Sequence, residues 1–462
     1  MKVVSLFLAL AATQALVEGS SRVGGLRTLV VVKDDGVRQS HSMFLKDLEA
    51  RGHSTTVVRA DDSGVVLQKY GEYLFDHLVL LAPDAEDIGG LDVQHIVNFV
   101  DDGGNLMMAL DETASDFMRD LASECGVEVD EPGTVVMDHV DHNSGSDDHT
   151  LVFTSNVAKV PLIVGSLKSS SAPVLFKGVG LAVGEENILA VRVLSAGAAA
   201  YSADPNEPIR DYPQAAGTDV LLVAAVQARN NARVLVSGSL DLLSNALFEA
   251  AVQAPGADSP VAPRSSNRQL AQELSKWTFC ERGVLRARDV SHQRADGRDP
   301  ERQLEHEQRE DLPTSLYPEP EIARDTLVYR IKDDVEYAVT IEEWDGKEWQ
   351  PYAADDVQME FVMLNPYVRA TLKHDDSGRF STVFKVPDVY GIYQFRIMYR
   401  RPGYSTLFLS DQVSVRPFRH NEYERFIPAA FPYYASTLAM MGSFFVFGFV
   451  FLYHKDVKPK SD

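Results

Sequence analysis

Cysteine is scarce in this sequence: the 462 residues include only Cys125 and Cys280. Two cysteines exclude a small scaffold held together by several disulfide bonds. In a secretory compartment the two can form one bond. They can equally remain thiols, because Cys280 follows a helical pattern and occupies a position typical of a packed side chain. The sequence leaves both alternatives open.

Positive charge is also in short supply. The chain has 44 Lys and Arg against 67 Asp and Glu, which gives a formal net charge of −23. Phosphate backbones need a cationic face, so this balance argues against a nucleic-acid partner. The hydrophobic fraction of 45% predicts a folded body, and the length predicts two or three domains.

Familiar catalytic motifs are missing. The sequence has neither the nucleophile elbow Gly-x-Ser-x-Gly nor a phosphate-loop signature, and Cys125 lies inside a helical pattern. Gly178, Gly180 and Gly184 miss the spacing of the dinucleotide fingerprint and indicate a turn. Asn-x-Ser/Thr is absent, so we expect no N-linked glycan on this chain. We predict no catalytic residue, no cofactor-binding residue and no cofactor.

The N-terminus has the order of a secretory signal. Lys2 supplies a positive charge, Val3–Ala12 is apolar, and small residues follow. Two cleavage sites are compatible with the pattern, one near Ala15 and one near Gly19. We predict a signal peptide over residues 1–19.

A second apolar run lies close to the C-terminus. Ala435–Tyr453 contains no charged residue, and as a helix it approaches the thickness of a bilayer core. Tyr433, Tyr434 and Tyr453 bracket it, as interfacial aromatic residues do. We predict a transmembrane helix over residues 433–453.

The tail beyond this run is basic. With a signal peptide and one late span, the bulk of the chain lies in the lumen and residues 454–462 form a cytosolic tail, a type I topology. Lys458 and Lys460 stand fifth and third from the end. This ending resembles the dilysine retrieval signal of endoplasmic reticulum membrane proteins. The alternative is a basic flank that only stops transfer through the membrane.

Strand and helix patterns alternate over residues 25–285. Arg27–Val32 and His77–Ala82 are short apolar runs that predict buried strands. Between them, Phe44 and Leu48 share one face of a predicted helix. Apolar strands that alternate with amphipathic helices predict an α/β domain with a parallel sheet covered on both faces.

The composition changes after this region. Residues 286–326 are charged and proline-bearing, which predicts a solvated linker. Residues 327–427 show apolar residues with a period of two, as in "VEYAVTIEEW", which predicts antiparallel strands and a β-sandwich domain. "DVYGIYQF" is similar to the tyrosine corner of immunoglobulin-like domains. Asp345-Gly346 predicts a hairpin turn.

Histidine and aspartate are concentrated in "DHVDHNSGSDDH", residues Asp138–His149. His139, His142 and His149 stand among four aspartates, a density compatible with a divalent metal in a membrane-tethered hydrolase or transferase. No standard ligand spacing fits, however, and serine and glycine interleave. We therefore expect an acidic surface loop and no metal site, and we keep the metal-dependent enzyme as the alternative function.

Four long strings resemble one known family. They are residues 44–83 ("FLKDLEARGHSTTVVRADDSGVVLQKYGEYLFDHLVLLAP"), Val226–Phe248 ("VQARNNARVLVSGSLDLLSNALF"), residues 384–405 ("FKVPDVYGIYQFRIMYRRPGYS") and residues 414–436 ("SVRPFRHNEYERFIPAAFPYYAS"). From about Gly25 onward the chain resembles the 48 kDa subunits of the oligosaccharyltransferase complex. The charged stretch near residues 294–310 is longer than the family pattern.

The resemblance implies a function. Such a subunit belongs to the endoplasmic reticulum complex that transfers a preassembled glycan from dolichyl diphosphate to asparagine of nascent proteins. The resemblance implies a non-catalytic, structural role beside a multi-span catalytic subunit, with other subunits and membrane lipid as further partners. It also implies a flavodoxin-like fold for the first domain, similar to class I glutamine amidotransferases. Their nucleophilic cysteine has no counterpart here, so amidase chemistry is not implied.

Overall fold

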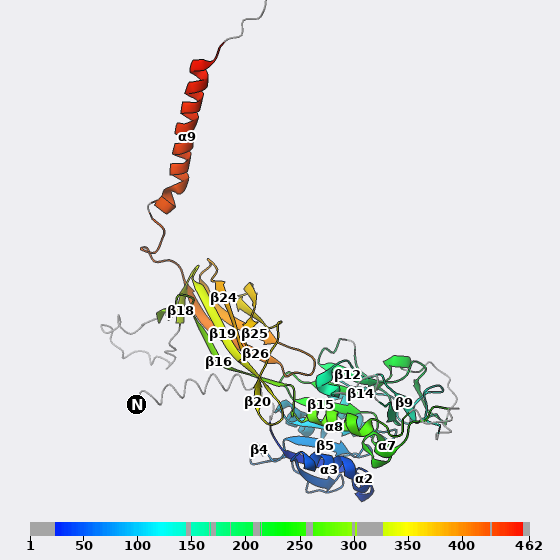
Figure 1. Cartoon of the computed structure of the whole chain (residues 1–462). Coiled ribbons are helices and arrows are strands. Elements are labelled where there is room, and N and C mark those ends of the chain that lie inside the picture. The colour runs from blue at the N-terminus through cyan, green and yellow to red at the C-terminus, as the bar shows by residue number, and fades with distance from the viewer. Residues whose placement is uncertain are drawn as a thin grey trace, which may run out of the picture.

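The computed structural model describes residues 24–144, 149–165, 167, 172–184, 186–206, 213, 215–255, 262–297, 301–302, 327–425 and 427–455. An α/β region, a β-sheet-rich region and one long helix follow one another along the molecule (Figure 1). The expected signal peptide, Lys458 and Lys460 lie outside the described residues.

Parallel strands form the centre of the α/β region. β1 (Arg27–Val32) pairs on one side with β2 (Ser54–Arg59) and on the other with β5 (His77–Leu81). β6 (Asn105–Ala109) and β15 (Arg233–Ser237) continue the sheet in the same direction. Taken in chain order, these parallel strands stand side by side in the order 2-1-3-4-5. The predicted strand over Arg27–Val32 is confirmed at both ends.

The sheet becomes antiparallel beyond β15. β14 (Leu221–Gln227) pairs with β15, β12 (Ala190–Ser195) and β11 (Leu181–Ala182), and β7 (Glu128–Val129) pairs with β11. Short ladders outside the sheet join β3 (Gln68–Lys69) to β4 (Glu72–Tyr73), β8 (Val135–Met137) to β13 (Tyr201–Ala203), and β9 (Val152–Thr154) to β10 (Val174–Phe176).

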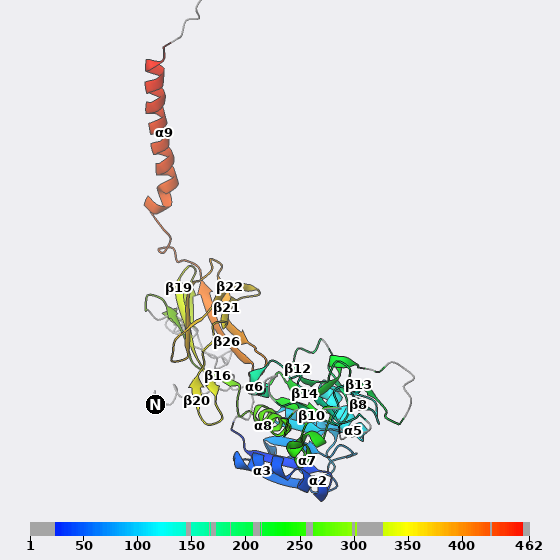
Figure 2. The ribbon, with the colours of Figure 1, turned by 45° about the vertical axis from the view of Figure 1, so that its right-hand side comes forward.

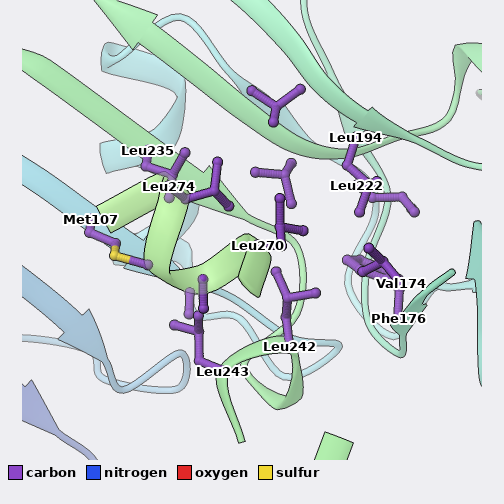
Figure 3. Packing of buried hydrophobic residues seen from close by; sticks show 14 of the residues in the cluster. Met107, Val174, Phe176, Leu194, Leu222, Leu235, Leu242, Leu243, Leu270 and Leu274 are labelled. Carbon is purple, nitrogen blue, oxygen red and sulfur yellow. The ribbon is translucent and has the colours of Figure 1, made fainter. Parts of the chain in front are cut away.

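Helices cover both faces of this sheet. They are α2 (Asp35–Ser40), α3 (Ser42–Ala50), α4 (Val93–Asp101), α5 (Asp116–Glu124), α6 (Pro161–Val164), α7 (Asn245–Glu249) and α8 (Asn267–Thr278). Successive strand side chains point to opposite faces, so Val30 packs in a core with α3 and α8. Its neighbour Val31 packs in a second core with α4 and α5. Figure 3 shows part of the first core, where Leu274 of α8 lies near Leu235 and Leu270 lies near Leu242.

The β-sheet-rich region contains two sheets. One joins β16 (Val284–Arg294), β19 (Asp334–Trp344), β20 (Trp349–Pro351), β23 (Lys373–His374) and β24 (Arg379–Lys385). The other joins β17 (Glu301–Arg302), β18 (Leu327–Arg330), β21 (Gln358–Val362), β22 (Pro366–Thr371), β25 (Gly391–Tyr399) and β26 (Leu407–Arg416). Side chains from both sheets form one core.

The period-two pattern of this region is confirmed. In β19 the alternate residues Val335, Tyr337, Val339 and Ile341 are all buried. The predicted hairpin at Asp345-Gly346 is confirmed too, because Trp344 pairs directly with Trp349 across it. The hydroxyl group of Tyr393 donates to the carbonyl oxygen of Val389 at 2.9 Å, the type of contact expected of a tyrosine corner.

The predicted start of the linker, at residue 286, is too early in the sequence. Residues 286–294 belong to β16, which pairs with β19 from Val284 opposite Trp344 to Arg294 opposite Val335. Residues 303–326, the greater part of that predicted linker, lie outside the described residues. The first strand of the second region therefore continues almost directly from α8.

The last helix, α9 (Ile427–Tyr453), stands apart from both regions (Figure 2). It has a mean hydropathy of 1.9 over its most apolar window, and none of that window is buried within the chain. A helix that is apolar on all sides needs lipid or other helices around it. It includes the whole predicted span 433–453 and is long enough to cross a membrane.

Candidate functional site

The histidines of the Asp138–His149 segment come together. The ring centroid of His149 lies 4.6 Å from that of His139 and 4.4 Å from that of His142, both in edge-to-face contact. The Nε2 atom of His139 lies 2.8 Å from the hydroxyl oxygen of Tyr201. Within the described ranges, no group of three or more His, Cys, Asp or Glu residues is arranged to hold a metal ion. These imidazoles therefore pack against each other instead of converging on one point.

The described part of this segment combines exposed and buried residues: Val140 is 62% exposed and His139 is exposed as well. Asp138 and His142 are 1% and 8% exposed. Oδ1 of Asp138 accepts hydrogen bonds from the amides of Val140 and Asp141, at 2.8 and 2.9 Å, which ties the turn together. Burial, and secondarily the Asp138 carboxylate, raise the pKa of Asp141. The acidic surface loop therefore stays a prediction, and Asp138 and His142 are two of its described residues that are buried.

The two cysteines are both free thiols, so the disulfide alternative is wrong. Burial raises the pKa of Cys125, at the end of α5, to about 12. Cys280 is fully buried, and desolvation raises its pKa as well, although Arg233 lies nearby. A cysteine nucleophile reacts as the thiolate, so neither side chain has the environment of a reactive cysteine.

The carboxyl ends of β1 and β5 form the crevice where open α/β sheets bind ligands. Here Lys33 follows β1 and Asp84 follows β5, and Nζ of Lys33 lies 2.6 Å from Oδ2 of Asp84. The hydrogen bond to Asp84 raises the pKa of Lys33, and Asp111 and Asp34 add to the effect. An ion pair thus joins the carboxyl ends of these two strands, and its lysine is a poor nucleophile. The sequence signal is a charged residue within two positions of the end of each apolar run.

Several contacts between the described parts of the two regions fall on one connection, residues 400–406 between β25 and β26. Its centre is Gly403, whose carbonyl oxygen accepts from Nε1 of Trp277 at 2.9 Å and from Arg233 at 3.3 Å. Gly403 has φ of +87°, and a Cβ atom there would lie 2.8 Å from Cβ of Leu162. Glycine is therefore required both by the backbone and by the close approach of α6.

Arg233 is the most unusual side chain of this junction. It is fully buried, and its guanidinium donates to the carbonyl oxygens of Trp277, Arg282, Gly283 and Gly403, at 2.6, 2.8, 2.7 and 3.3 Å. Desolvation lowers its pKa. Four carbonyl dipoles take the place of a carboxylate, so one side chain holds the end of α8, the start of β16 and the 400–406 connection.

Side-chain amides complete the junction. Asn231 accepts from the amide of Thr406 at 2.7 Å and donates to the carbonyl oxygen of the same residue at 3.1 Å. Gln227 donates to the carbonyl oxygen of Tyr404 at 2.8 Å. The side-chain amide of Asn231 thus pairs with the backbone of Thr406 as a neighbouring strand would. Together with the Gln227 contact, this pairing joins the two regions. Sequence reasoning missed this site, and its only local signal is the polar string "QARNNAR" between two apolar strands.

The comparisons with known proteins agree with this architecture. The family described as "OST48, N-terminal domain" matches residues 20–281, and "OST48 middle domain" matches residues 316–455. The chain is 45% identical to the dolichyl-diphosphooligosaccharide–protein glycosyltransferase 48 kDa subunit of Arabidopsis thaliana, over 93% of each chain. This chain belongs to the OST48 family.

Two further relatives carry the same name. The chain is 44% identical to the Danio rerio 48 kDa subunit, over 95% of this chain and 94% of that protein. It is 43% identical to the Drosophila melanogaster 48 kDa subunit, over 97% and 95%. Membership of the OST48 family confirms the expected function, an accessory subunit of the oligosaccharyltransferase complex in N-glycosylation, and does not favour the metal-dependent enzyme.

The two family matches also show to which domain each residue of the junction belongs. Arg233 and Trp277 lie in the part matched by the N-terminal domain, and Gly403 lies in the part matched by the middle domain. The contacts of Arg233 therefore join the two domains that define the family.

Proposed function

We propose that this chain is a non-catalytic, structural subunit of the oligosaccharyltransferase complex in the endoplasmic reticulum membrane. The match to 48 kDa subunits over nearly the whole chain carries this proposal. The buried thiols and the ion-paired Lys33 support it, because neither is suited to covalent chemistry. The chain contributes surfaces and an anchor, and the reacting groups belong to a multi-span catalytic partner.

We extend the proposal to the two folds. The strand order 2-1-3-4-5 is that of flavodoxin-like sheets, which supports a flavodoxin-like N-terminal domain. Two sheets around one core support a β-sandwich for the second domain. A junction fixed by Arg233 then presents both domains to partner subunits at a constant angle.

The proposed topology is type I. Residues 1–19 act as a signal peptide, the two domains face the lumen, and α9 crosses the membrane in contact with lipid and partner helices. Residues 454–462 then face the cytosol, where Lys458 and Lys460 act as a retrieval signal. The apolar surface of α9 supports this arrangement, because no other part of the described residues covers it.

Protease protection of sealed microsomes tests this proposal. With protease outside, we expect an epitope tag after Asp462 to be removed while the residues before α9 stay intact, and detergent then exposes them. Digestion of the large domains in sealed vesicles, with survival of the tail, contradicts the topology. Immunoprecipitation through a surviving lumenal fragment tests the complex: other subunits of the glycosyltransferase should co-purify.

A further inference from the structure

A cleft of about 720 Å³ opens beside the junction. One wall is formed by Lys159 and Val160 with the start of α6, and the other by Ala354, Asp356 and Pro402. Ligand sites of a few hundred cubic ångströms occur preferentially where two domains meet. No part of the proposed structural role requires an open cleft at this position.

Tyrosine hydroxyl groups form a row along one side of the cleft. The hydroxyl oxygens of Tyr352 and Tyr399 lie 2.9 Å apart, and Tyr399 donates to Oδ1 of Asp356 at 2.9 Å. The ring of Tyr404 lies edge-on against that of Tyr352, with 5.4 Å between the ring centroids. Burial raises the pKa of the three phenols, so they stay protonated at neutral pH.

The row suits a ligand that carries hydroxyl groups. Each phenol has one proton to donate and two acceptor positions, so a chain of phenols keeps spare acceptor capacity. Tyr352 and Tyr399 are buried, whereas Tyr404 is only half-buried and Pro402 is exposed. The accessible surface at the mouth therefore combines an aromatic ring, a proline ring and the edge of the hydroxyl row.

Lys159 is exposed at the rim of the cleft, and the other charged groups that line it are paired within the protein. Nε of Arg401 donates to Oδ2 of Asp356 at 2.6 Å, and Arg282 pairs with Glu273. Oδ1 of Asp355 lies 3.2 Å from Nε2 of His374. A cationic ligand would have to compete for Asp355 or Asp356, and an anionic ligand would find only Lys159 outside these pairs, whereas a neutral hydroxylated ligand can share them.

We propose that this cleft binds a neutral carbohydrate, with a pyranose ring against Tyr404 and Pro402 and its hydroxyl groups bonded to Tyr404, Asp356 and Arg401. A pyranose has the required combination of an apolar C–H face and a hydroxylated edge. A smaller cleft of about 300 Å³ shares Arg401, Pro402 and Tyr404, so a linked second sugar has room on the other side. This inference goes beyond the proposed structural role, which requires assembly only.

Binding of neutral trisaccharides to the full-length chain in mild detergent tests the proposal. The probes are linear trisaccharides of mannose, of glucose and of N-acetylglucosamine, measured by saturation-transfer NMR and calorimetry. We expect at least one to bind. Tyr404→Phe, which keeps the ring and removes one hydroxyl group, should weaken it about 3- to 10-fold.

Two further variants make the test specific. The side chain of Asp355 is fully exposed, so Asp355→Trp should fold normally, fill the mouth and abolish binding. Tyr390→Phe removes an exposed hydroxyl group outside the cleft and should leave the affinity unchanged. The melting temperature of each variant checks that it is folded.

Three results overturn the proposal: none of the trisaccharides binds at millimolar concentration, binding survives Asp355→Trp, or Tyr404→Phe and Tyr390→Phe have equal effects. Co-purification of the other subunits is measured on the same variants. If the sugar-binding test fails while the chain and its variants still assemble with the other subunits, only the carbohydrate proposal is contradicted and the structural role stands. A wild-type chain that binds sugar but does not assemble contradicts only that role.

Discussion

Cζ of Arg233 lies 4.8 Å from the centroid of the Trp277 indole ring, and the two side chains donate to the same carbonyl oxygen, that of Gly403. A guanidinium over an indole face is attracted by the ring quadrupole, most strongly where water is excluded. The pair therefore anchors the middle domain to the N-terminal domain from a fully buried position.

Replacing Arg233 with methionine should destabilise the chain by about 3 kcal/mol or more, because four carbonyl oxygens at the junction each lose a buried charge-assisted hydrogen bond. Arg233→Lys should fall between wild type and Arg233→Met, since one ammonium cannot reach all four. Arg229→Met, in the exposed turn before β15, is the matched control and should have little effect. Thermal unfolding of the purified chain measures all three, and equal melting temperatures for Arg233→Met and wild type contradict this account.

Gly403→Ala isolates the contact between the domains. Gly403 and Gly71 have nearly equal φ values, +87° and +85°, so alanine is strained to a similar degree at both. A Cβ atom at Gly71 meets nothing within 4 Å, whereas at Gly403 it meets Leu162 at 2.8 Å. We expect Gly71→Ala to cost about 1 kcal/mol and Gly403→Ala clearly more. Limited proteolysis between residues 281 and 327 should then accelerate only in Gly403→Ala, and equal rates in both variants would argue against a tight junction.

Local patterns predicted much of this fold. The strand at Arg27–Val32, the buried face of β19 and the helix α9 follow from hydrophobic periodicity and length, because each depends on neighbours in sequence. Strand β16 was missed because its C-terminal half is mostly polar and its pairing partner, β19, lies about 50 residues away in the sequence. The junction was missed for a related reason: the burial of Arg233 depends on three distant segments, and no local pattern reports them.

Both cysteines should be unreactive in the folded chain. Their raised pKa values keep them as neutral thiols at pH 8, and Cys280 is also inaccessible. A thiol reagent such as DTNB should report close to zero thiols in the native chain and two after unfolding without reductant. Only a disulfide bond would leave the unfolded chain without a reactive thiol, and that result would contradict the free cysteines.

Glu422 ties the segment before α9 to the second domain. Its carboxylate accepts from Arg416 at 2.7 and 2.9 Å and from the amide of Arg419 at 2.7 Å. The Arg416 hydrogen bonds, with Arg419 and Arg330 contributing, lower the pKa of Glu422 to about 2. The folded-state pKa is below the unfolded value of about 4.3, so this stabilisation is fully present above pH 4.3 and is lost as the pH falls toward 2.

Hydrogen exchange of the peptide 416–425 checks this dependence. After correction for the intrinsic pH dependence of exchange, the protection factors of this peptide should be the same at pH 7 and pH 5. Glu422→Gln should reduce them at both pH values. Glu424→Gln is the control, since Glu424 is exposed. Protection that already falls between pH 7 and pH 5 would show that Glu422 titrates near its ordinary range.

The central claim is that this chain assembles the glycosyltransferase and transfers nothing itself. It is tested most directly by glycan transfer from dolichyl diphosphate to an Asn-x-Thr peptide, measured for the purified chain, for the complete complex and for the complex depleted of this chain. We predict no transfer by the chain alone, full transfer by the complete complex, and loss of transfer on depletion with recovery when the chain is added back. Transfer by the purified chain alone, or undiminished transfer after its depletion, would contradict the account.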